Sequence, residues 1–67
     1  MRIGVNGEEV EVPDSIGSVS DLLRHFDLQN KVVVVELNKQ IVQQQAHSIT
    51  ALAEGDRVEI VHFVGGG

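Results

Sequence analysis

The chain of 67 residues contains no cysteine, no tryptophan and no tyrosine, and Pro13 is its one proline. Without cysteine there is no disulfide framework, no thiol nucleophile and no cysteine-based metal site. The aromatic residues are limited to Phe26 and Phe63, so a core built from this sequence must be made of Val, Leu and Ile. The sequence therefore predicts one small domain that is stabilised by aliphatic packing.

Long apolar runs and excess positive charge are also missing. The longest apolar run is the four valines at 32–35, which is far too short to span a bilayer. Ten acidic residues against five basic ones give a net charge of −5, which phosphate backbones repel. No basic and apolar leader is visible at the N-terminus. We therefore expect a cytoplasmic protein that binds neither nucleic acid nor membranes.

Alternation of apolar and polar residues predicts a β-hairpin at the start of the chain. Residues 1–6 and 8–12 each have period two, and Asn6-Gly7 between them tolerates the positive φ of a tight turn. The valines of the second strand are predicted to point inward. Its acids form a solvated face, which we favour over paired catalytic carboxylates: Glu8, Glu9 and Glu11.

A short amphipathic helix is predicted after the hairpin. Ser18 and Asp21 have the spacing of a capping box, with Asp in place of Glu or Gln. An apolar stripe at positions i, i+3, i+4 and i+7 follows: Val19, Leu22, Leu23 and Phe26. A helix of this length is not stable alone, so it must pack on a sheet.

The rest of the sequence predicts three more strands. Residues 32–37 are almost continuously apolar, which indicates a strand with both faces at least partly covered. The other expected elements are a turn at 38–39, a strand at 40–43, a loop at 43–49, a helical turn at 50–52 and a last strand at 57–63. One helix on one face of a mixed five-stranded sheet buries these stripes most economically, which is the α+β layout called β-grasp.

Three glycines, Gly65, Gly66 and Gly67, follow the last strand directly. Glycine has no Cβ to block a narrow channel, and three residues extend at most about 10 Å. We interpret 1–64 as the folded domain and 65–67 as a flexible tail that presents the Gly67 carboxylate to another protein's active site. The simpler alternative is a disordered end with no function.

Alternation in the last strand divides its side chains between two faces. If Val58 and Ile60 pack under the helix, Val61 and Phe63 lie on the uncovered face, where apolar side chains usually mark an interaction site. The alternative is a minor core in which the segment 43–53 covers Val61 and Phe63. The predicted partner-docking residues are Val32, Val34, Val61, Phe63 and Val64.

The three histidines, His25, His47 and His62, have no metal-ligand spacing. We interpret them as surface or rim residues and expect no metal site. No serine or cysteine nucleophile motif is present either, so we expect no catalytic residue and no enzymatic activity.

Several stretches of the chain match a known family pattern: the Asn6-Gly7 turn, 18–23, 34–38, 54–61 and the final Gly66-Gly67. Together they resemble ThiS, the family of sulfur carrier proteins of thiamin biosynthesis in the ubiquitin-like β-grasp superfamily. The resemblance implies that the last strand lies beside the first in mid-sheet. A third glycine, Gly65, departs from the family pattern by lengthening the tail without altering its reacting end.

The resemblance also implies a chemistry in which the chain is a co-substrate without a bound cofactor. A ThiF-type adenylyltransferase would use ATP to adenylate the Gly67 carboxylate. A sulfur-transfer enzyme of the cysteine desulfurase route would then convert it to a thiocarboxylate, 1-thioglycine. ThiG, the thiazole synthase, would accept that sulfur.

Three alternatives remain open at this point. The chain could serve another sulfur pathway, as the small subunit of molybdopterin synthase does, because such relatives share the tail. It could be a ubiquitin-like modifier that forms amide bonds to lysines. It could also be a plain binding module with an incidental tail.

Overall fold

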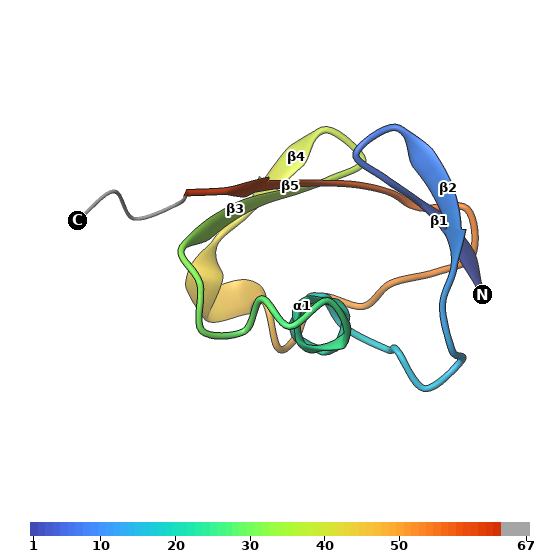
Figure 1. Ribbon diagram of the computed structural model, residues 1–67, viewed down its shortest axis with the longest axis horizontal. Coiled ribbons are helices and arrows are strands. Elements are labelled where there is room, and N and C mark those ends of the chain that lie inside the picture. The colour runs from blue at the N-terminus through green and yellow to red at the C-terminus, as the bar shows by residue number, and fades with distance from the viewer. Residues whose placement is uncertain (64–67) are drawn as a thin grey trace.

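The computed structural model describes residues 1–63. They form a five-stranded sheet with one α-helix packed against one face (Figure 1), which confirms the predicted β-grasp layout. The helix is α1 (Val19–His25), and a short 3-10 helix, η1 (Gln44–Ala46), follows the fourth strand. The strands are β1 (Arg2–Val5), β2 (Glu8–Glu11), β3 (Val33–Leu37), β4 (Gln40–Val42) and β5 (Arg57–His62).

Strand β5 lies in the middle of the sheet, whose order is β2-β1-β5-β3-β4. It pairs in parallel with β1, where Gly4 lies beside Arg57, and antiparallel with β3, where Val34 lies opposite Val61. The two outer pairs, β1 with β2 and β3 with β4, are antiparallel hairpins. The last strand is therefore flanked by both hairpins.

Both hairpins close through two residues with positive φ. In the first turn these are Asn6 (φ 52°) and Gly7 (φ 85°), and in the second Asn38 (φ 50°) and Lys39 (φ 71°). Positive φ at both central residues matches the right-handed twist of the flanking strands. The predicted turns at 6–7 and 38–39 are thus confirmed.

Helix α1 begins and ends with recognisable caps. The Ser18 hydroxyl accepts a hydrogen bond from the Asp21 backbone N–H (3.2 Å), as the capping-box spacing predicted. At the other end Asp27 has φ 61°, and the Leu28 N–H donates to the Leu23 carbonyl (2.7 Å), which is the Schellman arrangement. Phe26 is the C-cap residue and is 36% exposed, so it does not complete the predicted buried stripe.

The core lies between α1 and the inner face of the sheet. Its largest fully buried side chains come from the helix and from β1, β3 and β5: Ile3, Val19, Leu22, Val35 and Val58. All are aliphatic, as the scarcity of aromatic residues predicted. None of the helices among residues 1–63 has the length and apolar content needed to cross a membrane.

The segment between β4 and β5 differs from the prediction. The expected loop at 43–49 contains η1, and the expected helical turn at 50–52 is absent from the described chain. Residues 50–52 instead run beside the start of α1: the Val19 N–H donates to the Thr50 carbonyl (3.0 Å), and Ala51 forms a β-bridge with Ser18. Because these backbone groups find partners across the fold, they need no local helical bonds.

Candidate functional site

Strand β5 anchors the C-terminal end of the described chain. Val58 and Ile60 point toward α1 and are 1% and 8% exposed, as predicted. Their burial resists any movement of β5 out of the sheet, because apolar surface would then return to water. The strand is therefore a rigid base for whatever follows Phe63.

Asn6 fixes one edge of β5 through its side chain. Its Nδ2 donates to the Ile60 carbonyl (3.2 Å), and its Oδ1 accepts from the Ile60 N–H (2.7 Å). The Asn6 backbone N–H also donates to the Val58 carbonyl (2.9 Å). The amide thus extends the β1–β5 pairing by one step after β1 has turned away.

Asn38 does the same on the opposite edge, at the beginning of β5. Its backbone N–H donates to the Arg57 carbonyl (2.7 Å), its Oδ1 accepts from the Arg57 N–H (2.9 Å), and its Nδ2 donates to Asp56 Oδ1 (3.1 Å). Sequence reasoning assigned Asn6 and Asn38 to turns only. Asparagine at a hairpin position is a signal of such a double role, because its amide can replace a backbone partner.

The outer face of the sheet carries exposed apolar side chains next to the end of β5. Val61 and Phe63 are each 53% exposed, so the alternative in which the segment 43–53 covers them is wrong. Val34 lies opposite Val61 and is 38% exposed, and the Phe63 N–H donates to the carbonyl of Val32, which is 71% exposed. Four of the five predicted docking residues therefore share one exposed face.

A further apolar residue on this face was missed. Ile41 of β4 lies opposite Glu36 of β3, which places it on the same face, and it is 62% exposed. Its signal was a pair of consecutive apolar residues, Ile41 and Val42, in a predicted strand, because alternation places one of them on each face. The apolar patch is defined here as Val32, Val34, Ile41, Val61 and Phe63.

The apolar patch also explains the run of valines in β3. The run predicted a strand with both faces at least partly covered, and the structure agrees: Val35 is fully buried, and Val34 is 38% exposed. The run is continuous because its second face belongs to the exposed patch. An apolar face of this kind on a small protein indicates an interaction site.

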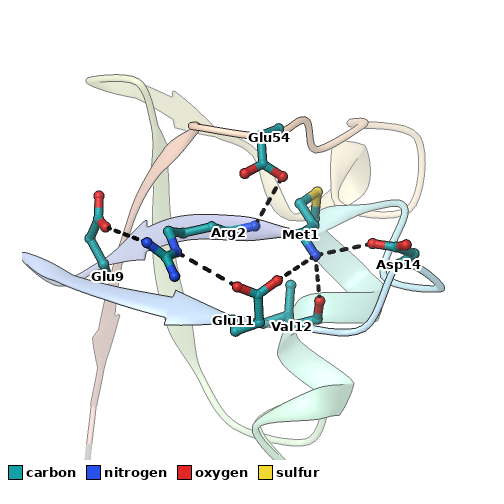
Figure 2. Close-up of polar contacts among 7 residues, drawn as sticks. All are labelled: Met1, Arg2, Glu9, Glu11, Val12, Asp14 and Glu54. Carbon is teal, nitrogen blue, oxygen red and sulfur yellow. Dashed lines mark hydrogen bonds and ion pairs between the residues drawn. The ribbon is translucent and has the colours of Figure 1, made fainter.

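The rest of the outer face, toward the N-terminus, is charged (Figure 2). The Arg2 side chain lies 3.8 Å from a Glu9 carboxylate oxygen and 3.6 Å from one of Glu11, and all three side chains are more than 60% exposed. The α-ammonium of Met1 donates to Glu11 Oε2 and Asp14 Oδ1, both at 3.0 Å. Glu9 and Glu11 thus form the solvated face that the sequence predicted, whereas Glu8, opposite Val5, is exposed on the other side of β2.

Two groups in this charged region have shifted pKa values. Hydrogen bonds to Glu11 and then Asp14 raise the pKa of the Met1 α-ammonium, and the hydrogen bond from Met1 lowers the pKa of Glu11. Both groups are exposed, so the shifts reflect surface pairing rather than an active site. The N-terminus lies at the end of the molecule remote from the last residues of β5 (Figure 1).

The histidines lie in three different environments. His62 is exposed on β5, and His25 is exposed with its ring edge-on to Phe26, at a centroid distance of 5.1 Å. His47 was predicted at the surface but is buried, 7% exposed, with Nε2 3.2 Å from the Val42 carbonyl. This contact gives one ring nitrogen a partner and joins the C-cap residue of η1 to β4. Within residues 1–63 no His, Asp and Glu side chains are grouped to hold a metal ion.

The remaining predicted site residues, Val64, Gly65, Gly66 and Gly67, lie outside the described residues. What the structure describes is their attachment point: a buried mid-sheet strand with an apolar patch beside it. These features define the class of protein as a ubiquitin-like β-grasp domain with an exposed apolar patch beside the end of its central strand.

The comparisons with known proteins identify the family. The family model described as "ThiS family" matches residues 2–67. The sulfur carrier protein ThiS of Bacillus subtilis (strain 168) is 43% identical over 63 residues, which are 94% of this chain and 96% of that protein. The chain therefore belongs to the ThiS family of sulfur carrier proteins, which act in thiamine biosynthesis as carriers without catalytic activity of their own.

Solved structures and a larger relative agree with this assignment. The crystal structure of a ThiS protein from Geobacter metallireducens is 35% identical with a TM-score of 0.81, and each chain is fully covered. The solution structure of a thiamine biosynthesis protein from the same organism gives a TM-score of 0.83 and is covered to 88%. A thiazole synthase of Paramagnetospirillum magneticum (strain ATCC 700264 / AMB-1) is 37% identical over the whole chain, which spans 20% of that enzyme's length.

Proposed function

We propose that this chain carries sulfur as a thiocarboxylate on Gly67 and delivers it to a thiazole synthase. In this proposal residues 1–64 are the docking domain and Gly65, Gly66 and Gly67 are the tail that enters the partner's active site. The chain binds no cofactor. The activating partner uses ATP, so we place the cycle in the cytoplasm.

The chemistry requires activation because a carboxylate has no good leaving group. A carboxylate oxygen of Gly67 attacks the α-phosphorus of ATP in the active site of a ThiF-type adenylyltransferase, and pyrophosphate leaves. The outer sulfur of a persulfide, supplied by a cysteine desulfurase route, then attacks the carbonyl carbon, and AMP leaves. A thiol such as free cysteine attacks the other sulfur of the resulting acyl disulfide, so the S–S bond breaks, a new disulfide forms on the thiol side and the thiocarboxylate is released. The role of the carrier is to hold that carbon in place, which lowers the entropic part of the barrier.

The position of β5 is the observation that carries this proposal. The strand is paired on both sides, and Asn6 and Asn38 fix its edges, so the residues after Phe63 start from a rigid point. A tail of three residues extends at most about 10 Å, so the partner's active site must lie close to the docked surface. The apolar patch lies beside this starting point and supplies that surface.

The relatives support the choice of a thiazole synthase of the ThiG type as the acceptor. The thiazole synthases of Paramagnetospirillum magneticum and of Magnetococcus marinus (strain ATCC BAA-1437 / JCM 17883 / MC-1) each contain a segment that aligns with the whole of this chain. Two functions joined in one polypeptide commonly act together. This favours thiazole formation over another sulfur pathway or over protein modification.

Intact-mass measurement tests the proposal. The chain, incubated with its adenylyltransferase, a cysteine desulfurase, cysteine and ATP, should become heavier by the difference between one sulfur and one oxygen atom. A variant that lacks Gly67 should gain no mass, because the new end stops one residue short of the reaction centre. Its thermal unfolding should match that of the full chain, which separates loss of chemistry from loss of fold.

Two results would contradict the proposal. One is sulfur uptake by the variant that lacks Gly67. The other is an unchanged carrier mass together with new high-molecular-weight conjugates, which would indicate a ubiquitin-like modifier instead.

A further inference from the structure

Within residues 1–63, no backbone partner faces one edge of β5 at its last residue, His62. Pairing between β1 and β5 reaches only Val58, and the Asn6 side chain extends it to Ile60. The backbone groups of the odd-numbered residues of β5 point toward β3. The same pattern continues at Phe63, whose N–H donates to the Val32 carbonyl (3.0 Å). Because backbone groups alternate along a strand, the N–H and C=O of His62 point to the other side, where β1 has turned away.

A cleft lies along this edge. It has a volume of about 260 Å³, and its walls come from the end of β1, the end of α1 and the end of β5. Phe26 and Leu28, which cap the helix, form its far wall, and neither is fully buried. The lining residues are Val5, Asn6, Phe26, Leu28, Ile60 and His62.

We propose that this edge accepts an extended segment of the thiazole synthase, which adds a strand to β5 at His62 and places one apolar side chain in the cleft. The identity of the partner rests on the function proposed above. The site itself is separate from the apolar patch, since it uses the backbone edge of β5 beyond the end of β1 and not the outer face of the sheet.

The chemistry of the edge favours a peptide strand as the occupant. A strand presents donors and acceptors in alternation, which matches the adjacent N–H and C=O of His62, whereas an anion would use the donor alone. A second copy of the chain is disfavoured because each copy carries a net charge of −5. An added strand would also set the direction in which the residues after His62 leave the fold.

Amide hydrogen exchange, followed by NMR with and without the thiazole synthase, tests the proposal. The His62 amide should exchange fast in the free chain and at least about tenfold more slowly in the complex. The Val61 amide is the internal control, because it faces β3 and is protected in both states. A complex that leaves the His62 amide unprotected would overturn strand addition while leaving the proposed function intact.

A matched pair of variants gives a second readout. His62→Pro removes the N–H at the open edge, where proline is tolerated, whereas His62→Ala removes only the side chain. We expect His62→Pro to weaken binding about fivefold to tenfold more than His62→Ala does, because both variants lose the side chain at the cleft but only the proline variant loses one main-chain hydrogen bond. Equal affinities of the two variants would refute the pairing.

Two other outcomes are also decisive. Protection of the His62 amide that appears without the enzyme and rises with protein concentration would identify a second copy as the occupant and overturn the proposal. A chain that binds no thiazole synthase at all would overturn both this proposal and the choice of that enzyme as acceptor.

Discussion

The two faces of the sheet use the same kinds of residue for different purposes. The inner face, under α1, carries Val35 and Ile60 as core, whereas the outer face carries Val34 and Val61 in the apolar patch. Neighbours in sequence thus have opposite roles, and strand parity decides between them. The role of an aliphatic residue in this sheet, in the core or in the apolar patch, is therefore known only once its face is assigned.

Truncating the side chains of two adjacent residues of β5, one on each face, tests this difference most directly. Ile60→Ala should lower the free energy of unfolding by about 2–5 kcal/mol, because it leaves a cavity in the core. Val61→Ala should change it by less than about 0.5 kcal/mol, since the side chain is half exposed. Denaturant unfolding monitored by circular dichroism measures both. Similar losses for the two variants would mean that the outer face is also core.

The edges of β5 provide the next test. Asn6→Ala removes two hydrogen bonds to Ile60. It also places alanine at φ 52°, a conformation that asparagine tolerates better. We therefore expect the free energy of unfolding to fall by about 1–3 kcal/mol. Asn6→Gly keeps the backbone conformation and removes the amide, so it isolates the side-chain bonds. If Asn6→Gly were as stable as the natural sequence, the amide contacts would contribute nothing to holding β5.

The apolar patch should matter for binding rather than folding. Phe63→Ala should weaken the complex with the adenylyltransferase or thiazole synthase about tenfold, as expected for a buried aromatic contact, with little change in stability. Ile49→Ala is the matched control, because Ile49 is 80% exposed and outside the apolar patch. Titration calorimetry gives the affinities. Comparable effects of both variants, or loss of the fold in Phe63→Ala, would count against a docking role.

The smallest expected effect concerns the charged end of the outer face. The raised pKa of the Met1 α-ammonium contributes stability at neutral pH that is lost as the pH rises above about 8, through the raised value. The lowered pKa of Glu11 contributes stability above its unfolded pKa that is lost as the pH falls below about 4. The temperature of thermal unfolding should therefore fall slightly at both the acidic and the alkaline end of this pH range.

The Glu11→Gln variant checks that assignment. It keeps a hydrogen-bond acceptor for Met1 but removes the charge, so the loss of stability at acidic pH should become smaller. In the natural chain, added salt should also reduce this loss, because salt screens the pairing. An unchanged pH profile would show that the pairing is too exposed to affect stability.

Local pattern predicted most of the fold. Period-two alternation located the strands of the first hairpin, and the continuous apolar run at 32–37 located β3. Asn6-Gly7 located the first turn, and Ser18 located the start of α1. The prediction was wrong where tertiary contacts decide: residues 50–52 pair with the start of α1, and His47 is buried against Val42. Such contacts join segments distant in sequence, or depend on loop geometry, and leave no periodic signal.

The candidate site was predicted only in part for the same reason. The parity of β5 placed Val61 and Phe63 on the exposed face correctly, but it carried no information about β4, and Ile41 was missed. The side-chain roles of Asn6 and Asn38 depend on which strand lies beside each turn. Strand order came from the family resemblance, because periodicity alone does not specify it.

The parallel pairing of β1 with β5 has a consequence for how the carrier matures. Gly4 meets Arg57 only after nearly the whole chain is available, so the sheet cannot close around a shorter product. Contacts between such distant segments are slow to form. An interrupted translation product would thus lack the central strand and, under the function proposed above, the reacting end as well, so it would not form a folded decoy that competes for the activating enzyme.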